Sequence, residues 1–421
     1  MNHLKNIQLW GDGHTHSHWS DGLEPIRELS AFFKRLDLDF RFQSDHCGIK
    51  MPEGTYLRKT HVAEKGHLLV PENFPRYLAE CRESSDGRHV AIPAIELDLD
   101  YGSFEANARH HYCHIKVHGF TDENQLPPEG WYKNKSLFKV LRGLKDRGLF
   151  VFLAHTNGDF LPWQDLKSPM FDGFELCYNM FDRYPPTDKG AFKCGFWDRW
   201  LAAGRRISIS TGSDCHQADM ACFSMRNVVA SPGKSAEAIQ KSFLEGKSYL
   251  SATWHPDVYK EIGLTKLQNR SLSGFACWFE VVKNLRRDLA RPIIQKIIRK
   301  SLAKNHGRVK RRDHPELSFS IEGMGMGETV RTVSGKRLKA VINARMNVDI
   351  EWLDLVKDGE IIKRFRPGAP FFREEFVFRA DKRRSYARLM AKGMDKNGRD
   401  EWLISNPIYL RSAAGRRLTR F

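Results

Sequence analysis

The stretch Asp12-Gly-His-Thr-His-Ser-His-Trp-Ser-Asp-Gly22, near the start of the chain, decides the fold. It follows a short apolar run, Ile7-Gln-Leu-Trp10, which is typical of a buried strand. Residues two apart in a strand point to the same face, so His14 and His16 can reach one pocket at the strand end. With Asp21 in the following Ser-Asp-Gly turn, they form a ligand set for zinc, manganese or iron, although the same residue types also satisfy turns and strand ends.

The composition is that of a large and basic globular protein. With 421 residues the chain is long enough for more than one domain, and its hydrophobic fraction of 41% is typical of a folded protein. The formal net charge of +17 favours an anionic partner: a phosphate compound, a nucleic acid, an acidic polymer or a membrane surface. No apolar run has the length of a membrane span, and the first residues lack the apolar core of a signal peptide, so we expect a cytoplasmic protein. The cysteines form no Cys-x-x-Cys pair, which favours reduced, buried thiols over a thiolate metal site.

Polar residues of metal-binding types recur where predicted strands end. A helix is expected from Leu23 to Arg35, and strands and helices then alternate along the chain. The strand ends carry His14 and His16, His46, Glu96, His155, and Asp214 with His216. In parallel α/β folds these ends meet on one face, whereas without a shared site each polar end would need hydrogen bonds of its own.

A histidine-rich segment, His110 to Gly119, has the alternation of a strand. Because alternate residues point to opposite faces, its histidines cannot all face one pocket. His114 begins the apolar-alternating part and is the expected ligand. We expect His110, His111 and His118 at an edge or on the surface.

Taken in order, these pieces resemble the PHP superfamily, the polymerase and histidinol phosphatase domain of metal-dependent phosphoesterases. The matching pieces are Asp12-Gly-His-Thr-His16, Ser20-Asp-Gly22, Ser44-Asp-His46, Pro93-Ala-Ile-Glu96, His114, Ala154-His155 and Gly212-Ser-Asp-Cys-His216. Within the superfamily the chain looks most like the branch of the carbamate-insecticide hydrolases. That branch carries a small β-domain after the barrel and often ends in Asn-Pro-Ile-Tyr, here Asn406 to Tyr409.

The resemblance implies an α/β fold, a distorted seven-stranded β/α barrel followed by a small β-sandwich-like domain. It also implies two or three divalent metal ions, which would be manganese, iron or zinc. The implied sites are His14, His16, Glu96 and Asp214; Glu96, His114 and His155; and Asp21, His46 and His216. Among these ligands, Glu96, Asp214 and His216 are expected to act in catalysis.

Neighbouring residues have less specific expectations. Asp12 and Asp45 either orient histidine rings or cap turns, and Asn157 either touches substrate or caps a turn. Cys215 alternates with Asp214 and His216, should therefore point away from the site, and is interpreted as structural.

The chain divides into a metallohydrolase barrel and three further segments. The predicted boundaries are 1–255 for the barrel, 256–312 for a basic, partly helical insertion, 313–412 for the β-sandwich-like domain and 413–421 for a basic tail. Residues 48–89 read as a long loop with some helix. Alternating patterns and the turn signals Asp358-Gly359 and Lys396-Asn-Gly398 predict the β-domain.

The basic insertion has its highest density of Lys and Arg in 283–312, where apolar residues fall at helical spacing. Three interpretations compete: the amphipathic helix docks on the barrel, binds an anionic membrane surface, or follows a nucleic-acid backbone.

The function predicted from the sequence is that of a metal-dependent hydrolase, with a phosphoesterase favoured. A metal-bound hydroxide at a di- or trinuclear centre would attack an anionic small molecule or a nucleotide end. The alternative enzyme is a carboxylic-ester or carbamate hydrolase with the same centre. The alternative of another class is a nucleic-acid- or membrane-binding protein on the same scaffold; the oligomeric state is left open.

Overall fold

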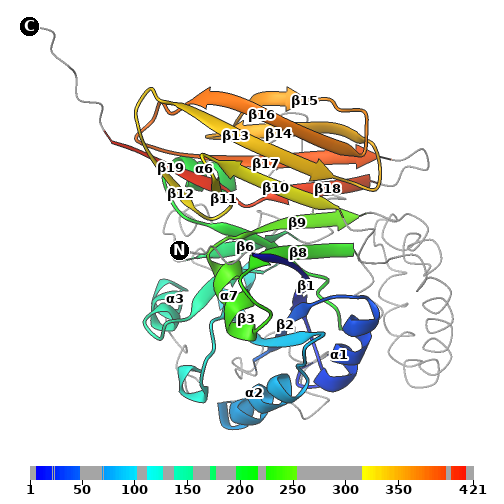
Figure 1. The fold of residues 1–421 in the computed structure, drawn as a ribbon. Coiled ribbons are helices and arrows are strands. Elements are labelled where there is room, and N and C mark those ends of the chain that lie inside the picture. Colours follow the sequence, from blue (N-terminus) through cyan, green and yellow to red (C-terminus); the bar gives the residue numbers. More distant parts are fainter. Residues whose placement is uncertain are drawn as a thin grey trace, which may run out of the picture.

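The computed structural model describes residues 6–20, 22, 24–47, 69, 71–101, 111–126, 137–154, 171–176, 196–216, 224–253, 315–394 and 400–413. Outside these residues lie the predictions for Asp21, His110, His155, Asn157, the 256–312 insertion, residues 414–421 of the tail and the Lys396-Asn-Gly398 turn. Two layers are visible in Figure 1: a lower α/β part from the first half of the chain and an upper β part from the second half.

The first part contains one sheet flanked by helices. Its strands are β1 (Ile7–Thr15), β2 (Phe40–His46), β3 (Val90–Tyr101), β4 (His111–His118), β5 (Phe150–Leu153), β6 (Gly173–Leu176), β7 (Ser208–Thr211), β8 (Ser224–Ser231) and β9 (Ser248–Thr253). Its α-helices are α1 (Ile26–Arg35), α2 (Phe74–Glu83), α3 (Leu137–Lys145), α6 (Phe196–Ala202) and α7 (Ala236–Leu244), and its 3-10 turns are η2 (Pro71–Asn73) and η3 (Glu123–Gln125).

The sheet is mixed rather than uniformly parallel. Strands β1, β2 and β3 run parallel, as do β5, β6 and β7, but β4 is antiparallel to both of its neighbours. Strands β8 and β9 extend the sheet beyond β1 with antiparallel pairing. The α/β class is therefore as expected from the sequence, and the closed seven-stranded barrel stays a prediction.

The second part consists of strands only. They are β10 (Glu316–Ile321), β11 (Met324–Gly325), β12 (Thr329–Val333), β13 (Arg337–Arg345), β14 (Ile350–Lys357), β15 (Glu360–Phe365), β16 (Phe371–Arg379), β17 (Arg384–Met394), β18 (Asp400–Ser405) and β19 (Ile408–Ala413). A separate four-stranded antiparallel sheet has the order β11-β10-β13-β16. Buried residues from this sheet, such as Phe319 and Leu338, share one hydrophobic cluster with Leu353 of β14 and Leu389 of β17.

The predicted Asp358-Gly359 turn joins β14 to β15. Both residues have positive φ, 53° at Asp358 and 86° at Gly359. Two consecutive positive values are what a two-residue hairpin of type I′ requires, and Asp-Gly is a preferred sequence for it.

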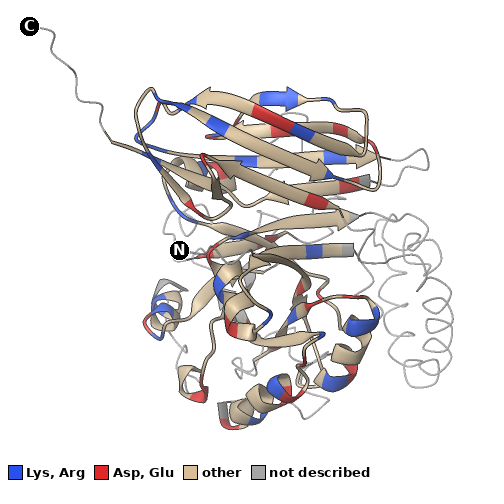
Figure 2. Ribbon diagram, in the orientation of Figure 1, with Lys and Arg blue, Asp and Glu red and all other residues tan. Residues whose placement is uncertain are grey.

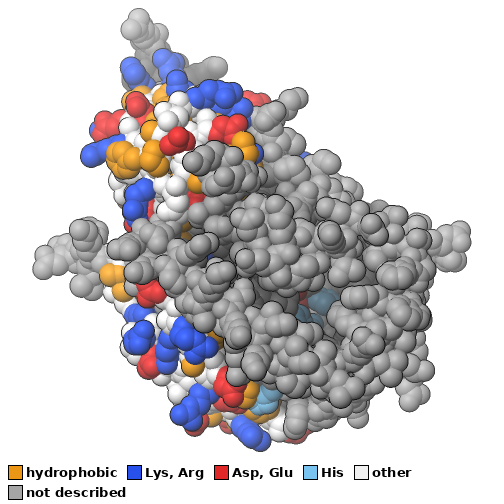
Figure 3. Space-filling view, turned by 90° about the vertical axis from the view of Figure 1, so that its right-hand side faces the viewer, with side chains coloured by type: hydrophobic (Ala, Val, Ile, Leu, Met, Phe, Trp, Pro, Cys, Tyr) orange, Lys and Arg blue, Asp and Glu red, His pale blue; other side chains and the backbone are white. Residues whose placement is uncertain are grey.

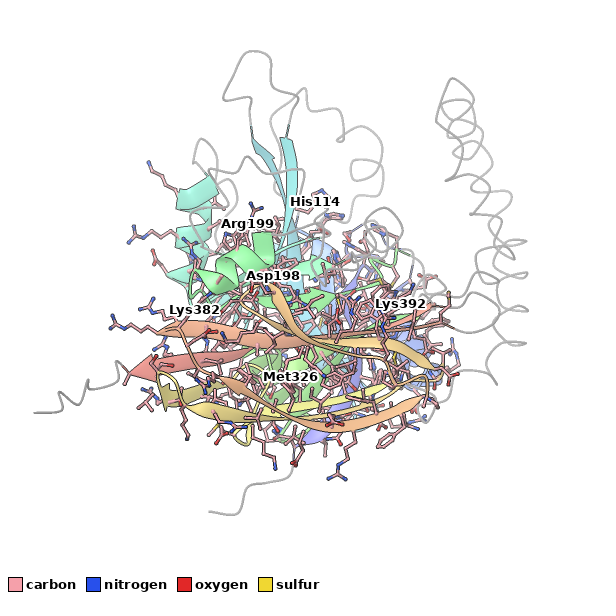
Figure 4. All side chains as sticks on the ribbon, turned by 90° about the horizontal axis from the view of Figure 1, so that it is seen from above. His114, Asp198, Arg199, Met326, Lys382 and Lys392 are labelled. Carbon is pink, nitrogen blue, oxygen red and sulfur yellow. The ribbon has the colours of Figure 1, made fainter. Side chains whose placement is uncertain are left out.

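The two parts are joined by hydrogen bonds within a sheet. Strand β18 pairs antiparallel with β9, so the β part continues the sheet of the α/β part into one 15-stranded sheet. A buried ion pair adds to this junction, because Arg388 of β17 donates from Nε and Nη2 to the carboxylate of Asp198 on α6 at 2.9 and 2.8 Å. Figure 4, seen from above, labels Asp198 at this junction.

Charged residues of both signs are distributed over both parts (Figure 2). Within the part of the chain that the structure describes, no helix combines the length and the apolar character needed to cross a membrane.

Candidate metal centre

Strand β1 brings two histidines to the site. The side chains of His14 and His16 are fully buried, and their Nε2 atoms lie 3.0 Å apart. Just past β1, the backbone N–H of His16 donates to the carbonyl of Cys215 at 2.9 Å. This bond fixes the end of β1 against the segment that follows β7.

Two carboxylates complete a compact group with these rings. Glu96 of β3 places Oε2 3.0 Å from Nε2 of His14 and 3.2 Å from Nε2 of His16. Asp214, after β7, places Oδ1 3.1 Å from Nε2 of His16 and 3.5 Å from Nε2 of His14. Ligands of a tetrahedral ion with bonds of about 2.0–2.1 Å lie roughly 3.3 Å apart, so the spacing and the chemistry of this group fit a divalent metal.

A second group shares His16. His16, His46 and His216 each offer a ring nitrogen within 4.8 Å of the others. The ring of His16 stacks on His216 with centroids 4.2 Å apart and on His46 at 4.6 Å. Because Nδ1 of His216 donates to the carbonyl of Asp214 at 2.9 Å, its lone pair is on Nε2.

His114 reaches the first group from the antiparallel strand β4. Its Nδ1 lies 2.9 Å from Oε1 of Glu96, the oxygen that does not face His14. In the register of β3 and β4, His114 lies opposite Asp98, next to the pair of Glu96 and Lys116. His114 and Glu96 are therefore in contact, while His155, the third member of the predicted second site, lies outside the described residues.

The structure thus brings together every described member of the predicted ligand set: His14, His16, His46, Glu96, His114, Asp214 and His216. The four residues of the first predicted site lie together in one group. Of the third predicted site, His46 and His216 lie together with His16, and Asp21 is not described. Figure 3 shows histidine side chains, in pale blue, on the side of the molecule that faces right in Figure 1.

Glu175 and Lys116 are parts of the site that the sequence motifs did not predict. Oε2 of Glu175, on β6, accepts a hydrogen bond from Nδ1 of His14 at 2.8 Å, which keeps the lone pair of His14 on Nε2, toward the other ligands. Lys116 of β4 donates to Oε1 of Glu175 at 2.7 Å and to the carbonyl of Gly13 at 2.9 Å. The available signal was a charged residue within each of two otherwise buried strands, because a buried charge requires a partner.

The electrostatics of the first group favour positive charge. Burial alone would lower the pKa of His14, but the carboxylates of Glu175, Glu96 and Asp214 raise it to about 10. Burial opposes ionisation of Glu96, yet His14, His114 and His46 hold the pKa of its carboxyl well below the usual range. A divalent ion would supply the positive charge that these carboxylates attract.

Asp12 and Asp45 bind backbone N–H groups and polar side chains, including Arg226 for Asp12 and Gln43 for Asp45, rather than histidine rings. Asp12 accepts from the backbone N–H groups of His14 at 3.1 Å and Ser213 at 2.9 Å. Asp45 accepts from Ser20 Oγ at 2.8 Å, and that hydroxyl lies 3.4 Å from Nδ1 of His16. Only Asp45 is therefore linked to a ligand ring, through one intermediate side chain.

The backbone around the site leaves no room for ordinary side chains. A Cβ on Gly13 would lie 2.2 Å from the carbonyl oxygen of Thr211, and one on Gly212 would lie 2.3 Å from Cβ of His14. Asp214 has a φ of 51°, a left-handed value that is uncommon outside glycine but tolerated by aspartate. Cys215 is fully buried in a hydrophobic cluster with Trp10 and Leu29, as its structural interpretation requires.

The expectation that His118 lies at an edge or on the surface is wrong. His118 is fully buried, with its ring 4.8 Å from that of Phe42, 5.1 Å from Phe152 and 5.7 Å from Phe243. Neither ring nitrogen has a hydrogen-bond partner among the residues that the structure describes, and burial holds the pKa of His118 well below its ordinary value. The prediction failed because helix α7, distant in sequence, brings Phe243 against this ring.

Comparison with known proteins gives distant likenesses only. No family model matches the chain, and no curated protein matches it. Among solved structures, a two-domain protein from Bacteroides vulgatus containing a predicted PHP-like metal-dependent phosphoesterase is 14% identical, with a TM-score of 0.40, and the match covers 97% of this chain and 96% of that one.

Two further structures match parts of the chain. A candidate metal-dependent phosphoesterase from Bifidobacterium adolescentis is 15% identical with a TM-score of 0.29, covering 49% of this chain and 87% of that one. Fibronectin(III)-like modules of Clostridium thermocellum CbhA are 18% identical with a TM-score of 0.18, covering 24% of this chain and 49% of that one. At these TM-scores the likenesses establish neither a family nor an activity.

Proposed function

We propose that this protein is a metal-dependent hydrolase of the PHP type that cleaves phosphoesters. The observation that carries the proposal is the convergence of His14, His16, Glu96 and Asp214, whose donor atoms have the spacing of ligands around one divalent ion. The ordered resemblance of the sequence motifs to the PHP superfamily supports it. Assignment to the carbamate-hydrolase branch, and location in the cytoplasm, stay predictions.

Two groups of side chains offer ligands for metal ions. His14, His16, Glu96 and Asp214 would hold one ion, and His46 and His216, which lie close to His16, offer ligands for a further one. When bound, zinc, manganese or iron would act as a Lewis acid and lower the pKa of a coordinated water towards neutrality. Glu175 fixes the ring of His14, and Ser20 lies beside the ring of His16, so neither ligand has to be reoriented when an ion binds.

A phosphoester is the favoured substrate class because the chain is strongly basic. Its formal net charge of +17 attracts anions and so raises their local concentration. A neutral carboxylic ester or carbamate would gain nothing from this charge. Binding of nucleic acid or an anionic membrane through residues 283–312 remains a separate proposal, since that segment lies outside the described residues.

The test is turnover after addition of manganese, iron or zinc, measured on an aryl phosphate monoester, the matching diester and an aryl carboxylic ester. We expect metal-dependent phosphoester cleavage that falls by more than about 100-fold in His14→Ala and Asp214→Asn, because even outer partners of a metal ligand are worth about 10–100-fold. Asp86→Asn is the matched control, since Asp86 contacts Lys34 at the surface.

Each other outcome has a definite meaning. Cleavage of the carboxylic ester alone would replace the phosphoesterase proposal by the esterase alternative. Absence of both turnover and bound metal by elemental analysis would refute the enzyme proposal, and would direct attention to the basic segment.

A further inference from the structure

Among the described residues, no strand pairs with the outer edge of strand β7, which is closed by side chains instead. On its other edge β7 pairs with β6, and the N–H of Ser208 donates in that direction, to the carbonyl of Asp172 at 2.9 Å. Backbone groups alternate between the two edges of a strand, so Ile209 and Thr211 present theirs to the outer edge. Buried backbone groups require partners, and here the partners are two asparagine amides.

The first amide belongs to Asn406, in the Asn-Pro-Ile-Tyr motif that has no role in the proposed chemistry. Its Oδ1 accepts from the N–H of Ile209 at 2.8 Å, and its Nδ2 donates to the carbonyl of the same residue at 3.2 Å. Nδ2 also donates to Ser248 Oγ at 2.9 Å. Asn406 is fully buried and connects β18 to β19, so the β part supplies a direct partner for β7.

The second amide repeats this arrangement two residues further along. Oδ1 of Asn227, on β8, accepts from the N–H of Thr211 at 3.0 Å, and its Nδ2 donates to the carbonyl of Thr211 at 2.6 Å. Each amide therefore pairs with both backbone groups of one residue, as a residue of an adjacent strand would.

The series continues into the candidate metal centre. Two residues beyond Thr211, the N–H of Ser213 donates to Oδ1 of Asp12 at 2.9 Å. Beyond Ser213, the hydrogen bonds join backbone to backbone. The N–H of Asp214 donates to the carbonyl of His14 at 3.0 Å, and the N–H of His16 donates to the carbonyl of Cys215 at 2.9 Å. We call the bonds of Ile209, Thr211 and Ser213 to Asn406, Asn227 and Asp12 the β7 seam.

We propose that the β7 seam positions Asp214 and His216, and that Asn406 makes the β part necessary for an intact centre. The seam fixes the position of β7 relative to β1 along the strand direction. It therefore determines where Asp214 and His216 lie relative to His14 and His16. Asn406 and Asn227 are positioning residues, because neither touches the ligand atoms. The part of the proposal that concerns metal affinity rests on the proposed function, whereas the part that concerns the strand does not.

Two measurements on the full-length protein test the proposal. Hydrogen–deuterium exchange of the metal-free protein reports directly on residues 208–216, and competition with a chromophoric chelator gives the dissociation constant for Zn²⁺. We expect Asn406→Ala and Asn227→Ala to accelerate exchange in 208–216 and to weaken zinc binding about tenfold, at the lower end of the range for groups that support metal ligands.

Gln240→Ala is the matched control. Gln240 on α7 also buries an amide that accepts from a backbone N–H, that of Gly119 at 3.3 Å, but it has no bond to β7. This variant should change neither exchange in 208–216 nor zinc affinity. If Asn406→Ala does not fold, Asn406→Asp keeps the size and the acceptor for Ile209 while losing the Nδ2 donor, and the same two readouts apply.

The outcomes are separable. Unchanged exchange in 208–216 would overturn the seam, and accelerated exchange with unchanged zinc affinity would overturn its positioning role. Wild-type protein that binds no zinc would refute the proposed metal centre, and the exchange measurement would still decide about the seam.

Discussion

One face of β4 passes through two buried regions of opposite character. His114 contacts Glu96, Lys116 pairs with Glu175, and His118, the last residue of the strand, lies among phenylalanine rings. These three residues are two apart, so a strand places them on the same face. The face therefore changes from carboxylate-lined to aromatic over the length of one strand.

The two regions act oppositely on histidine. His14 and His118 are both fully buried, yet carboxylates raise the pKa of His14 to about 10 whereas burial holds the pKa of His118 far below its ordinary value. Burial is thus common to both, and the partners decide the charge. The carboxylate-lined region stabilises a positive charge, and the aromatic region disfavours one.

The largest effect is expected at the boundary between these regions. Lys116→Met leaves the Glu175 carboxylate buried without its lysine, which should lower the free energy of unfolding by about 3–5 kcal/mol, the usual cost of breaking a buried ion pair. Urea denaturation measures the change. Adding Glu175→Gln should recover a part of it, because the buried carboxylate that has lost its lysine is then replaced by a neutral amide.

Lys34→Met is the control for Lys116→Met, since it removes a lysine that pairs with Asp86 at the surface and should cost no more than about 1 kcal/mol. Equal decreases in the free energy of unfolding in the two variants would show that the buried pair of Lys116 with Glu175 stabilises the protein no more than the surface pair does.

A smaller effect is expected when only the orientation of a ligand is disturbed. Glu175→Gln removes the charge that faces Nδ1 of His14 but keeps an oxygen in place, and should weaken zinc binding about 10–100-fold. Chelator competition gives the dissociation constant. Glu245→Gln, which removes the partner of Lys247, should leave zinc binding unchanged, and a zinc affinity of Glu175→Gln equal to wild type would show that Glu175 does not orient His14.

The smallest effect concerns the aromatic region and appears only in acid. His118 stays neutral in the folded protein, whereas the unfolded chain takes up a proton at this residue below a pH of about 6.5. The free energy of unfolding should therefore fall with decreasing pH, by up to about 1.4 kcal/mol per pH unit from this residue. His118→Leu should reduce that slope.

Urea denaturation at a series of pH values measures the slope. His89 serves for comparison, because burial lowers its pKa too, but its ring nitrogens bond to Arg41 and to the carbonyl of Leu38. His89→Leu should therefore destabilise the protein at every pH. An unchanged slope in His118→Leu would mean that His118 is protonated in the folded state as well.

Local sequence patterns sufficed for most individual elements and for the ligand types. The spacing of His14 and His16 predicted their convergence, and apolar periodicity predicted α1 close to its observed bounds. The Asp358-Gly359 turn followed from the conformational preference of its two residues. Each of these features is decided by residues within a few positions of one another.

Features that join distant segments could not be predicted in this way. The antiparallel direction of β4, the contact of Phe243 with His118, and the bonds of Asn406 to Ile209 all depend on which elements become neighbours. A buried glutamate or asparagine carries no mark of its partner in the sequence. Its partner follows only from the strand order.

The sequence by itself therefore determined the kind of chemistry that this protein can hold, because it places histidines and carboxylates, side chains that can bind metals, at strand ends. The tertiary structure decided which of these residues share an ion-sized space, which buried groups support them, and that the β part reaches strand β7 through Asn406. The physical reason is that residue type and local periodicity are properties of short segments. Distances between ligand atoms and the charge state of a buried group depend on every element packed around them.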